Sequence, residues 1–320
     1  MDKNNNEIRS TTIEQDGVGS HVVINADSLR YIKEMPDNSV DAIITDPPYF
    51  IDGMGEDWDN GKLRKKTSHA SVVGSLHVGM KFDPQHGRNL EKFMYLLSVE
   101  AKRVLKPGGF YLSFSQGRLY HRMACGIEDA GFEIRDMLIW YREGQAKAFS
   151  QEHFVRKMKI PQKEKDAIIK TLDGRKTPQL KGQSEPIVLA QNPKDGTFIN
   201  NWIEHGVGLI DTTKSLDGKF PGTVMDVPKP KGQERAESKH LTLKPIRLME
   251  HLINVFTKPG DIVFDPFSGS GTTGVACVNT GRQYIGIELT DEFYNESIER
   301  IKAHINQLSC FYLKIPRNMN

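Results

Sequence analysis

The sequence has few cysteines and no long apolar segment, and these two absences exclude several classes of protein. Its 320 residues contain three cysteines (Cys125, Cys277 and Cys310), which are far apart and form no C-x-x-C pair. We therefore expect neither a disulfide framework nor a zinc cluster, and we predict no metal site. No apolar run approaches the roughly 18–20 residues of a membrane span, and the first residues are too polar for a signal peptide. These features predict a soluble protein of a reducing compartment, the cytoplasm.

Net charge is also small, but the positive charge is unevenly distributed. The 43 Lys and Arg residues oppose 41 Asp and Glu residues, so the total indicates no polyanionic partner. Residues 143–185, however, contain ten basic and six acidic residues, a local net charge of +4. A solvated surface and a nucleic-acid contact are both open interpretations of such a stretch and of a second basic group near residue 64. The basic residues considered as contacts are Lys62, Arg64, Lys65, Lys66, Lys147, Arg156, Lys157 and Lys159.

Strands alternate with helices on both sides of this polar middle region. The first regular element is expected at residues 21–27, and a helix and a short β-branched strand at Ala42–Thr45 complete a βαβ unit. Residues 50–85 are predicted to form a long mobile loop, and residues 192–238 to be irregular. The pattern predicts an α/β fold with one doubly wound, mainly parallel sheet interrupted by an insert. Further strands are expected at 110–114, 137–141, 186–190, 261–267 and 283–289, and helices at 90–105, 117–132, 245–257, 272–279 and from 290 onward.

A glycine-rich turn follows one of the last strands. It reads FDPFSGSGTTG and contains Gly269 and Gly271, where a missing Cβ lets the backbone approach a ligand at a helix N-terminus. Taken alone it also fits a plain tight turn. Glu288 ends the next strand, 17 residues after Gly271, where a carboxylate can bind the two hydroxyls of a ribose. The pair favours a nucleoside cofactor.

The tetrapeptide Asp46-Pro47-Pro48-Tyr49 ends the Ala42–Thr45 strand. Two prolines leave two carbonyls without a competing N–H on a stiff, extended backbone. The segment thus offers a carboxylate, a rigid carbonyl acceptor and an aromatic face. An exocyclic amino group of a nucleobase attacks poorly because its lone pair is delocalised, and two acceptors on its N–H bonds would help it react. Tyr49 could hold the base by stacking, a contact of about 1–3 kcal/mol.

These motifs together resemble the amino-group DNA methyltransferases that use S-adenosylmethionine. The order, with DPPY before FDPFSGSG, is similar to that of the circularly permuted β group, and the resemblance covers most of the chain. Residues 25–29 (NADSL) resemble the family's G-D-S/C segment, with Ala26 in place of glycine. Residues 240–245 (HLTLKP) resemble its H-P-T-x-K-P segment, with Leu241 in place of proline. The segments VLKPGG (104–109) and SEPI (184–187) resemble its middle strands.

The resemblance implies a Rossmann-like methyltransferase sheet and roles for individual residues. It implies that Asp46, Pro47, Pro48 and Tyr49 bind and activate the target amino group. It further implies that Asp27 lies near the cofactor adenine, that Glu288 binds the ribose, and that Thr242 and Lys244 bind the methionine carboxylate. It assigns the cofactor turn to Asp265, Pro266, Phe267, Ser268, Gly269, Gly271 and Thr272.

The spelling Asp-Pro-Pro-Tyr resembles adenine-N6 members more than cytosine-N4 members, whose motif begins with serine. The expected function is site-specific methyl transfer to adenine N6 in double-stranded DNA, by direct in-line transfer after base flipping. A cytosine-N4 methyltransferase and a catalytically silent DNA-binding module remain alternatives. An RNA or protein-glutamine methyltransferase and an NAD-dependent dehydrogenase fit the residues less well. A homodimer and a cognate restriction endonuclease are partners that the resemblance leaves open.

The expected division of the chain has three parts. Residues 1–142 form the first part of the catalytic domain, and residues 239–320 form its cofactor-binding second part. Residues 143–238 form a target-recognition insert, with a strand near 186–190 that returns to the sheet.

Overall fold

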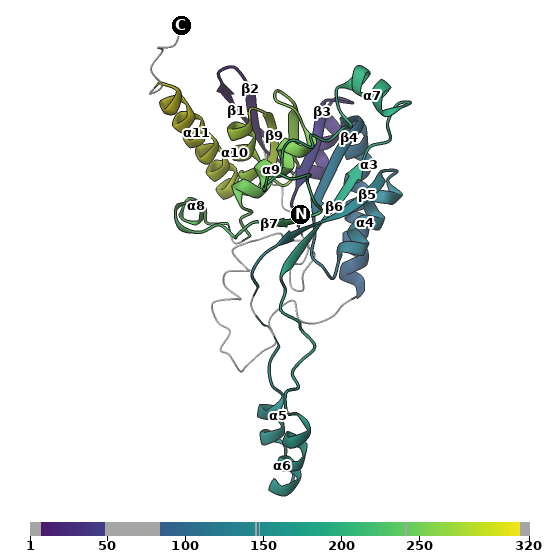
Figure 1. Ribbon diagram of the computed structural model, residues 1–320, viewed down its shortest axis with the longest axis vertical. Coiled ribbons are helices and arrows are strands. Elements are labelled where there is room, and N and C mark those ends of the chain that lie inside the picture. Colours follow the sequence, from purple (N-terminus) through teal and green to yellow (C-terminus); the bar gives the residue numbers. More distant parts are fainter. Residues whose placement is uncertain (1–7, 49–83, 145, 147, 241, 314–320) are drawn as a thin grey trace, which may run out of the picture.

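The protein is built on one nine-stranded mixed sheet with helices on both faces (Figure 1). The computed structural model describes residues 8–48, 84–144, 146, 148–240 and 242–313. Across the sheet the strands follow the order β1-β2-β9-β8-β3-β4-β6-β5-β7. In chain order they are β1 (Arg9–Gln15), β2 (Gly19–Asn25), β3 (Val40–Thr45), β4 (Leu105–Phe114), β5 (Glu133–Tyr141), β6 (Ser184–Gln191), β7 (Val224–Asp226), β8 (Ile262–Asp265) and β9 (Gln283–Glu288).

The centre of the sheet is parallel, as the sequence predicts. From β2 through β9, β8 and β3 to β4, each strand pairs in parallel with the next, whereas β6 runs antiparallel between β4 and β5. The last two strands of the chain, β8 and β9, lie between the early strands β2 and β3. The final third of the chain therefore completes the middle of the sheet, which is the permuted order expected from the motifs.

Two helical layers cover the sheet. The helices α3 and α4 pack on one face, and α9, α10 and α11 pack on the other. Within the described ranges, no helix is both long and apolar enough to cross a membrane. The helices are α1 (Ser28–Tyr31), the 3-10 helix η1 (Ile32–Glu34), α3 (Pro84–Val104), α4 (Tyr120–Asp129), α5 (Glu152–Lys157), α6 (Gln162–Thr171), α7 (Phe198–His205), α8 (Gly232–Ala236), α9 (Ile246–Phe256), α10 (Thr272–Thr280) and α11 (Asp291–Leu313).

Each central strand supplies apolar side chains to both layers because successive residues of a strand face opposite ways. In β3, Ile43 packs with the α3 and α4 layer, and its neighbour Ile44 packs with the α9, α10 and α11 layer. Both side chains are fully buried. Burial on two faces explains why this strand is a continuous apolar run in the sequence rather than an alternating one.

Two segments differ from the sequence expectations, and a third lies almost wholly outside the described residues. The expectation that regular structure begins at residue 21 is wrong, because β1 precedes β2 and pairs with it antiparallel. β1 is an edge strand in which Ile13 alone is buried, so it has no apolar pattern to detect. Residues 192–238 are not wholly irregular, since α7, β7 and α8 lie there. The predicted loop 50–85 lies outside the described residues except for its last two residues, which begin α3.

A projecting arm extends from the ends of β5 and β6 and carries α5 and α6 at its tip (Figure 1). We define the arm as the described residues between 143 and 183. The outgoing and returning segments of the arm pair near its tip through a β-bridge between Ser150 and Lys176. The Thr177 N–H also donates to the Phe149 carbonyl over 3.1 Å. The arm is thus an excursion from the sheet edge where the parallel strands end.

Candidate active site

The parallel strands end at one edge of the sheet, and the predicted site residues gather there. Asp46 follows β3, Asp265 ends β8, and Glu288 ends β9. The pairing of β2 with β9 puts Asn25 opposite Glu288, so Asp27 lies just beyond the same edge. Open α/β sheets bind their ligands at this edge, where strand order reverses. The fold therefore brings three distant sequence segments together.

The Asp-Pro-Pro segment leaves the most buried strand of the sheet. Pro47 is buried, and Asp46 and Pro48 are half-buried. Tyr49 lies outside the described residues, so its expected stacking role stays a prediction. Thr45, the last residue of β3, donates its hydroxyl hydrogen to Asp265 Oδ1 over 2.6 Å. This bond ties the base of the tetrapeptide to the strand that carries the glycine-rich turn.

Lys244 reaches the tetrapeptide from the segment before α9. Its ammonium donates to Asp46 Oδ2, lies 3.5 Å from Glu185 Oε2, and sits 5.0 Å from the centre of the Phe114 ring. Only 7% of the side chain is exposed. Burial lowers the pKa of Lys244, but the negative charges of Asp46 and Glu185 outweigh it and leave the pKa raised. Lys244 therefore stays charged and binds the acid of the tetrapeptide, a contact that the sequence did not predict.

Asp265 supports the glycine-rich turn from below. Its carboxylate accepts hydrogen bonds from the hydroxyls of Thr45 and Thr273, each over 2.6 Å, and from the Phe267 N–H over 3.0 Å. Burial raises the pKa of Asp265 to about 6, against the three donors, which lower it. With 3% of its surface exposed, this side chain holds the turn in shape and faces the protein interior.

The two glycines of the turn have different functions. Gly271 has φ +78°, and a Cβ there would lie 2.7 Å from Ser297 Cβ, so close packing against α11 requires glycine. Gly269 has φ +51°, and a Cβ there would point toward the His240 imidazole, 3.4 Å from Nε2. A side chain at position 269 would thus fill the space between the turn and His240. Glycine leaves that space open.

Glu288 is fixed in place at the end of β9. Its Oε2 accepts from the Gly269 N–H over 3.0 Å, and its Oε1 accepts from the Thr290 N–H and hydroxyl over 2.9 and 2.7 Å. Burial is the largest influence on the pKa of Glu288 and leaves it raised. Asp27, nearby, is exposed and caps α1 by accepting from the Arg30 N–H over 2.9 Å. A ribose bound at this edge would contact the Glu288 carboxylate, which also accepts a hydrogen bond from the turn. It would lie near a second, exposed carboxylate, that of Asp27.

The other predicted turn residues also hold the segment in place. The Pro266 carbonyl accepts from the Ser28 hydroxyl, the Phe267 ring lies 5.9 Å from that of Phe93, the Ser268 hydroxyl accepts from Tyr284 over 2.9 Å, and the Thr272 hydroxyl accepts from Arg300 over 3.2 Å. Together these contacts anchor the turn to α1, α3, β9 and α11.

Buried Arg300 and half-buried His240 are two basic groups near the turn whose positions were not predicted. Arg300 in α11 is 5% exposed and donates to the Ser270 carbonyl over 2.7 Å, which braces the turn from behind. His240 packs edge-on against Phe293 with ring centres 4.7 Å apart, and its Nδ1 lies 3.4 Å from the exposed Thr242 hydroxyl. Burial is the largest influence on the pKa of His240 and lowers it. Arg300 is charged and is not one of the apolar residues of the α11 stripe, so no apolar pattern in the sequence marks it as buried.

The predicted basic contacts separate into two groups. Lys62, Arg64, Lys65, Lys66 and Lys147 lie outside the described residues. Arg156, Lys157 and Lys159 are exposed on and just after α5, at the tip of the arm. The structure therefore places these three residues away from the glycine-rich turn, on a surface of their own (Figure 1).

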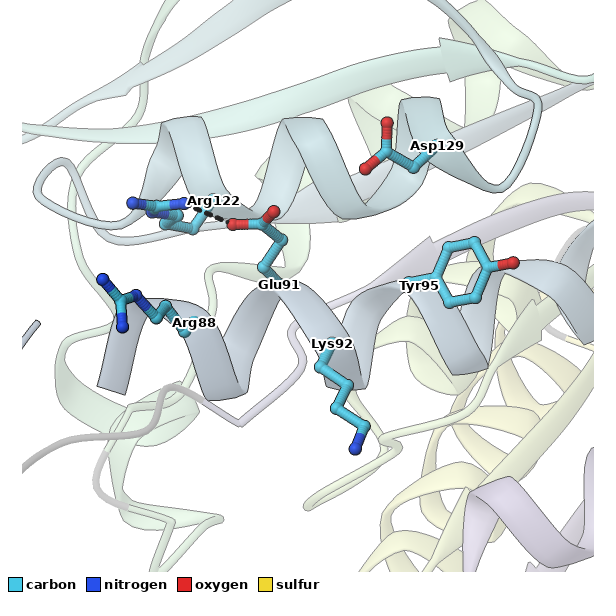
Figure 2. Close-up of a pocket in the computed structure, with 6 residues that line it drawn as sticks. All are labelled: Arg88, Glu91, Lys92, Tyr95, Arg122 and Asp129. Carbon is cyan, nitrogen blue, oxygen red and sulfur yellow. Dashed lines mark hydrogen bonds and ion pairs between the residues drawn. The ribbon is translucent and has the colours of Figure 1, made fainter. Parts of the chain in front are cut away.

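A polar groove of about 510 Å³ lies between α3 and α4 (Figure 2). An ion pair between Arg122 and Glu91, 2.6 Å long, crosses it. None of the predicted site residues lines this groove. Its lining residues are Arg88, Glu91, Lys92, Tyr95, Arg122 and Asp129.

Comparison with known proteins identifies the family of this chain. A DNA methylase family of the N6/N4 methyltransferase type matches residues 40–299. The type II methyltransferase M.HindIII of Haemophilus influenzae is 30% identical, over 91% of this chain and 98% of its own. The type II methyltransferase M2.DpnII of Streptococcus pneumoniae is 29% identical, over 88% of this chain and 90% of its own.

Solved structures show the same fold. The PvuII cytosine-N4-specific DNA methyltransferase aligns with a TM-score of 0.59 and 17% identity, over 93% of this chain and 96% of that one. A complex of M1.HpyAVI with S-adenosylmethionine aligns with a TM-score of 0.51 and 23% identity, over 87% and 98%. The match to the family spans most of the chain and includes both DPP and the glycine-rich turn. The chain therefore belongs to the N6/N4 DNA methylase family and is a DNA methyltransferase that uses S-adenosylmethionine.

Proposed function

We propose that the enzyme methylates the N6 amino group of adenine in double-stranded DNA. The observation that carries this proposal is the position of Asp46 and Pro47, which leave β3 directly beside the glycine-rich turn on β8. This arrangement sets a carboxylate and a rigid carbonyl next to the cofactor site. The Asp-Pro-Pro spelling supports adenine over cytosine.

The proposed chemistry is a direct transfer in one step. The Asp46 carboxylate and the Pro47 carbonyl accept hydrogen bonds from the two N–H groups of the target amino group. They thereby stabilise the positive charge that develops on its nitrogen. The contacts of Lys244 and Thr45 at the two sides of this segment restrict its movement. Alignment of nitrogen and methyl carbon then supplies much of the acceleration.

The cofactor supplies a methyl group on a sulfonium, which is a good leaving group, so no covalent enzyme intermediate is required. We propose that Glu288 holds its ribose, Asp27 lies near its adenine, and Thr242 lies near its carboxylate end. Gly269 leaves the space that this ligand needs beneath His240. Lys244 contributes positive charge between that end and Asp46.

DNA recognition is proposed to involve residues 143–238, and chiefly the arm. α6 has no buried residue, and Val155 is the buried residue of α5, so their basic side chains lie at the surface, where phosphates can approach them. The positive charge of these exposed side chains attracts the negatively charged phosphates of DNA, and this attraction weakens as the salt concentration rises. The target adenine must leave the duplex, at a cost of a few kcal/mol.

Two measurements test the proposal. Asp46→Asn is expected to slow methyl transfer by about 100-fold or more while binding of S-adenosylmethionine persists, because it removes the acceptor charge and keeps the size. Near-normal turnover in that variant contradicts the site. Digestion of the methylated DNA to nucleosides identifies the base, and N4-methylcytosine in place of N6-methyladenine establishes the alternative substrate. Absence of transfer by the unmodified chain supports the silent-module alternative.

Two protein partners are also proposed, a restriction endonuclease and a second copy of this chain. Because M.HindIII and M2.DpnII are type II methyltransferases, we propose a cognate restriction endonuclease that cleaves the same unmethylated site. Protection of treated DNA from such an enzyme tests this pairing. A homodimer is proposed from the family resemblance, and sedimentation of the purified protein tests it.

A further inference from the structure

Four side chains of alternating charge form a row at the active-site edge. Asp46 contacts Lys244, Lys244 lies 3.5 Å from Glu185 Oε2, and Glu185 Oε1 forms an ion pair of 2.7 Å with the Arg142 guanidinium. Their formal charges sum to zero. Three of the four are about one-fifth exposed, and Lys244 is nearly buried. The row therefore lies where water screens charges weakly.

The sheet itself lines up the row. Phe114 is opposite Ile187 in the pairing of β4 with β6, and Glu185 is opposite Trp140 in the pairing of β5 with β6. Because β6 runs antiparallel to its neighbours, its first residues meet the last residues of β4 and β5 at this edge. Glu185 is thus presented to the active site by the start of a strand, whereas Asp46, Asp265 and Glu288 lie at strand ends.

Lys244 is shared between two carboxylates that compete for it. Its ammonium is in hydrogen-bond contact with Asp46, but Glu185 Oε2 is buried, forms no hydrogen bond, and lies 3.5 Å from the same ammonium. A buried acceptor without a donor is costly unless another interaction compensates it. Here the compensation is the attraction of Glu185 to Lys244, which opposes the attraction to Asp46.

We propose that Glu185 is a positioning residue for methyl transfer, which shares Lys244 with Asp46 and so keeps the ammonium from neutralising the catalytic carboxylate. The inference rests on the role proposed above for Asp46. When Glu185 loses its charge, the full charge of Lys244 acts on Asp46. The carboxylate then attracts the hydrogens of the target amino group less strongly, and Lys244 has more influence on its orientation.

Arg142 extends this arrangement to the base of the arm. Its guanidinium lies 5.7 Å from the centre of the Trp140 ring, and its backbone N–H donates to the Gln183 carbonyl over 2.8 Å, where the two chains of the arm leave the sheet. Arg142 thus fixes Glu185 from the side away from the site. We expect Arg142→Gln to affect transfer in the same direction as Glu185→Gln, and less.

The test is single-turnover methyl transfer by the full-length Glu185→Gln variant with saturating S-adenosylmethionine and DNA. We expect the rate to fall about 10-fold to 100-fold, as for other misplaced reacting groups, with both dissociation constants nearly unchanged. Glu133→Gln is the matched control, because Glu133 is an exposed acid at the opposite end of β5, paired with Arg135. Its transfer rate is expected to equal that of the unmodified enzyme.

A double variant distinguishes positioning from a general structural effect. If Glu185 acts through Lys244, Glu185→Gln slows transfer little further in a Lys244→Met background, because the shared group is already gone. A wild-type rate in Glu185→Gln, or a loss explained by weaker binding of cofactor or DNA, overturns the inference. If Glu185→Gln does not fold, Glu185→Asp replaces it, and a wild-type rate with the carboxylate withdrawn by one methylene overturns the inference equally. An inert Asp46→Asn beside an active Glu185→Gln rejects this inference alone, whereas an active Asp46→Asn rejects the site itself.

Discussion

The glycine-rich turn and the arm are stabilised in different ways, although both belong to the same catalytic edge. At the turn, buried side chains such as Asp265 and Arg300 are held by several hydrogen bonds each. On the arm, α6 has no buried residue, and Phe154 of α5 is 53% exposed. We therefore expect substitutions in the turn to disturb its packed structure, whereas substitutions on the arm change its surface charge and leave its structure largely intact.

A pair of glycines provides the largest expected contrast. Gly271 of the turn and Gly174 of the arm both have positive φ, +78° and +68°. Alanine at either position is strained by about 1–2 kcal/mol. At Gly271 the new Cβ would also overlap Ser297, whereas at Gly174 nothing lies within 4 Å. Overpacking of this kind adds about 1–3 kcal/mol, so we expect Gly271→Ala to cost about 2–5 kcal/mol in the free energy of unfolding.

Denaturant unfolding and calorimetric binding of S-adenosylmethionine measure the contrast. Gly271→Ala is expected to weaken cofactor binding as well as stability, because the turn must shift to admit the methyl group. Gly174→Ala is expected to leave cofactor binding unchanged. Equal losses of stability at the two positions would contradict the view that tight packing, and not φ alone, selects glycine in the turn.

The strand ends of the site were predictable from the sequence, because the parallel strands are short apolar runs and a carboxylate follows or ends each. Asp46, Asp265 and Glu288 are found where that pattern puts them, on neighbouring strands. The pairing of Lys244 with Asp46 and Glu185 was not predictable in this way. It depends on β6 entering the sheet antiparallel beside β4, a long-range pairing that no local pattern encodes.

The polar elements were missed for a different reason. β1 buries Ile13 alone, and α7 exposes Ile199 and Ile203 to 58% and 75%, so neither element shows a clear division between a buried apolar face and a polar one. Local periodicity reports burial, and it fails where an element lies at an edge of the fold. Arg300 was missed because it is charged. Its burial depends on hydrogen bonds, and these leave no apolar pattern in the sequence.

The pH dependence of stability gives the second contrast. Burial raises the pKa of Asp265 from 3.8 to about 6, so the folded protein favours the neutral acid. The stabilising contribution of this group is present below the unfolded pKa and is lost as pH rises through about 6. Two pKa units correspond to about 3 kcal/mol. Asp265→Asn removes this dependence, and we expect the stability of the variant relative to the unmodified protein to improve by up to about 3 kcal/mol from about pH 4 to pH 7.

Unfolding by urea at several pH values checks this prediction. The variant is expected to be less stable at low pH, because an amide cannot accept all of the hydrogen bonds from Thr45, Phe267 and Thr273. Asp173→Asn is the matched change on the arm, where the side chain is exposed and surface substitutions change stability by about 0.5 kcal/mol or less. A difference between Asp265→Asn and the unmodified protein that stays constant with pH contradicts the expected titration.

The smallest expected effect belongs to the arm and concerns DNA affinity alone. Lys157→Gln combined with Lys159→Gln removes two exposed charges near its tip, and the slope of log affinity against log salt falls by about 0.9 for each phosphate that the protein no longer neutralises. We expect binding at low salt to weaken about 10-fold, with cofactor binding and unfolding free energy unchanged. Lys33→Gln combined with Lys302→Gln, on η1 and α11, is the control of equal charge. If both double variants change the salt slope equally, net charge and not the arm governs DNA binding. That result would contradict the proposed role of the arm in binding DNA.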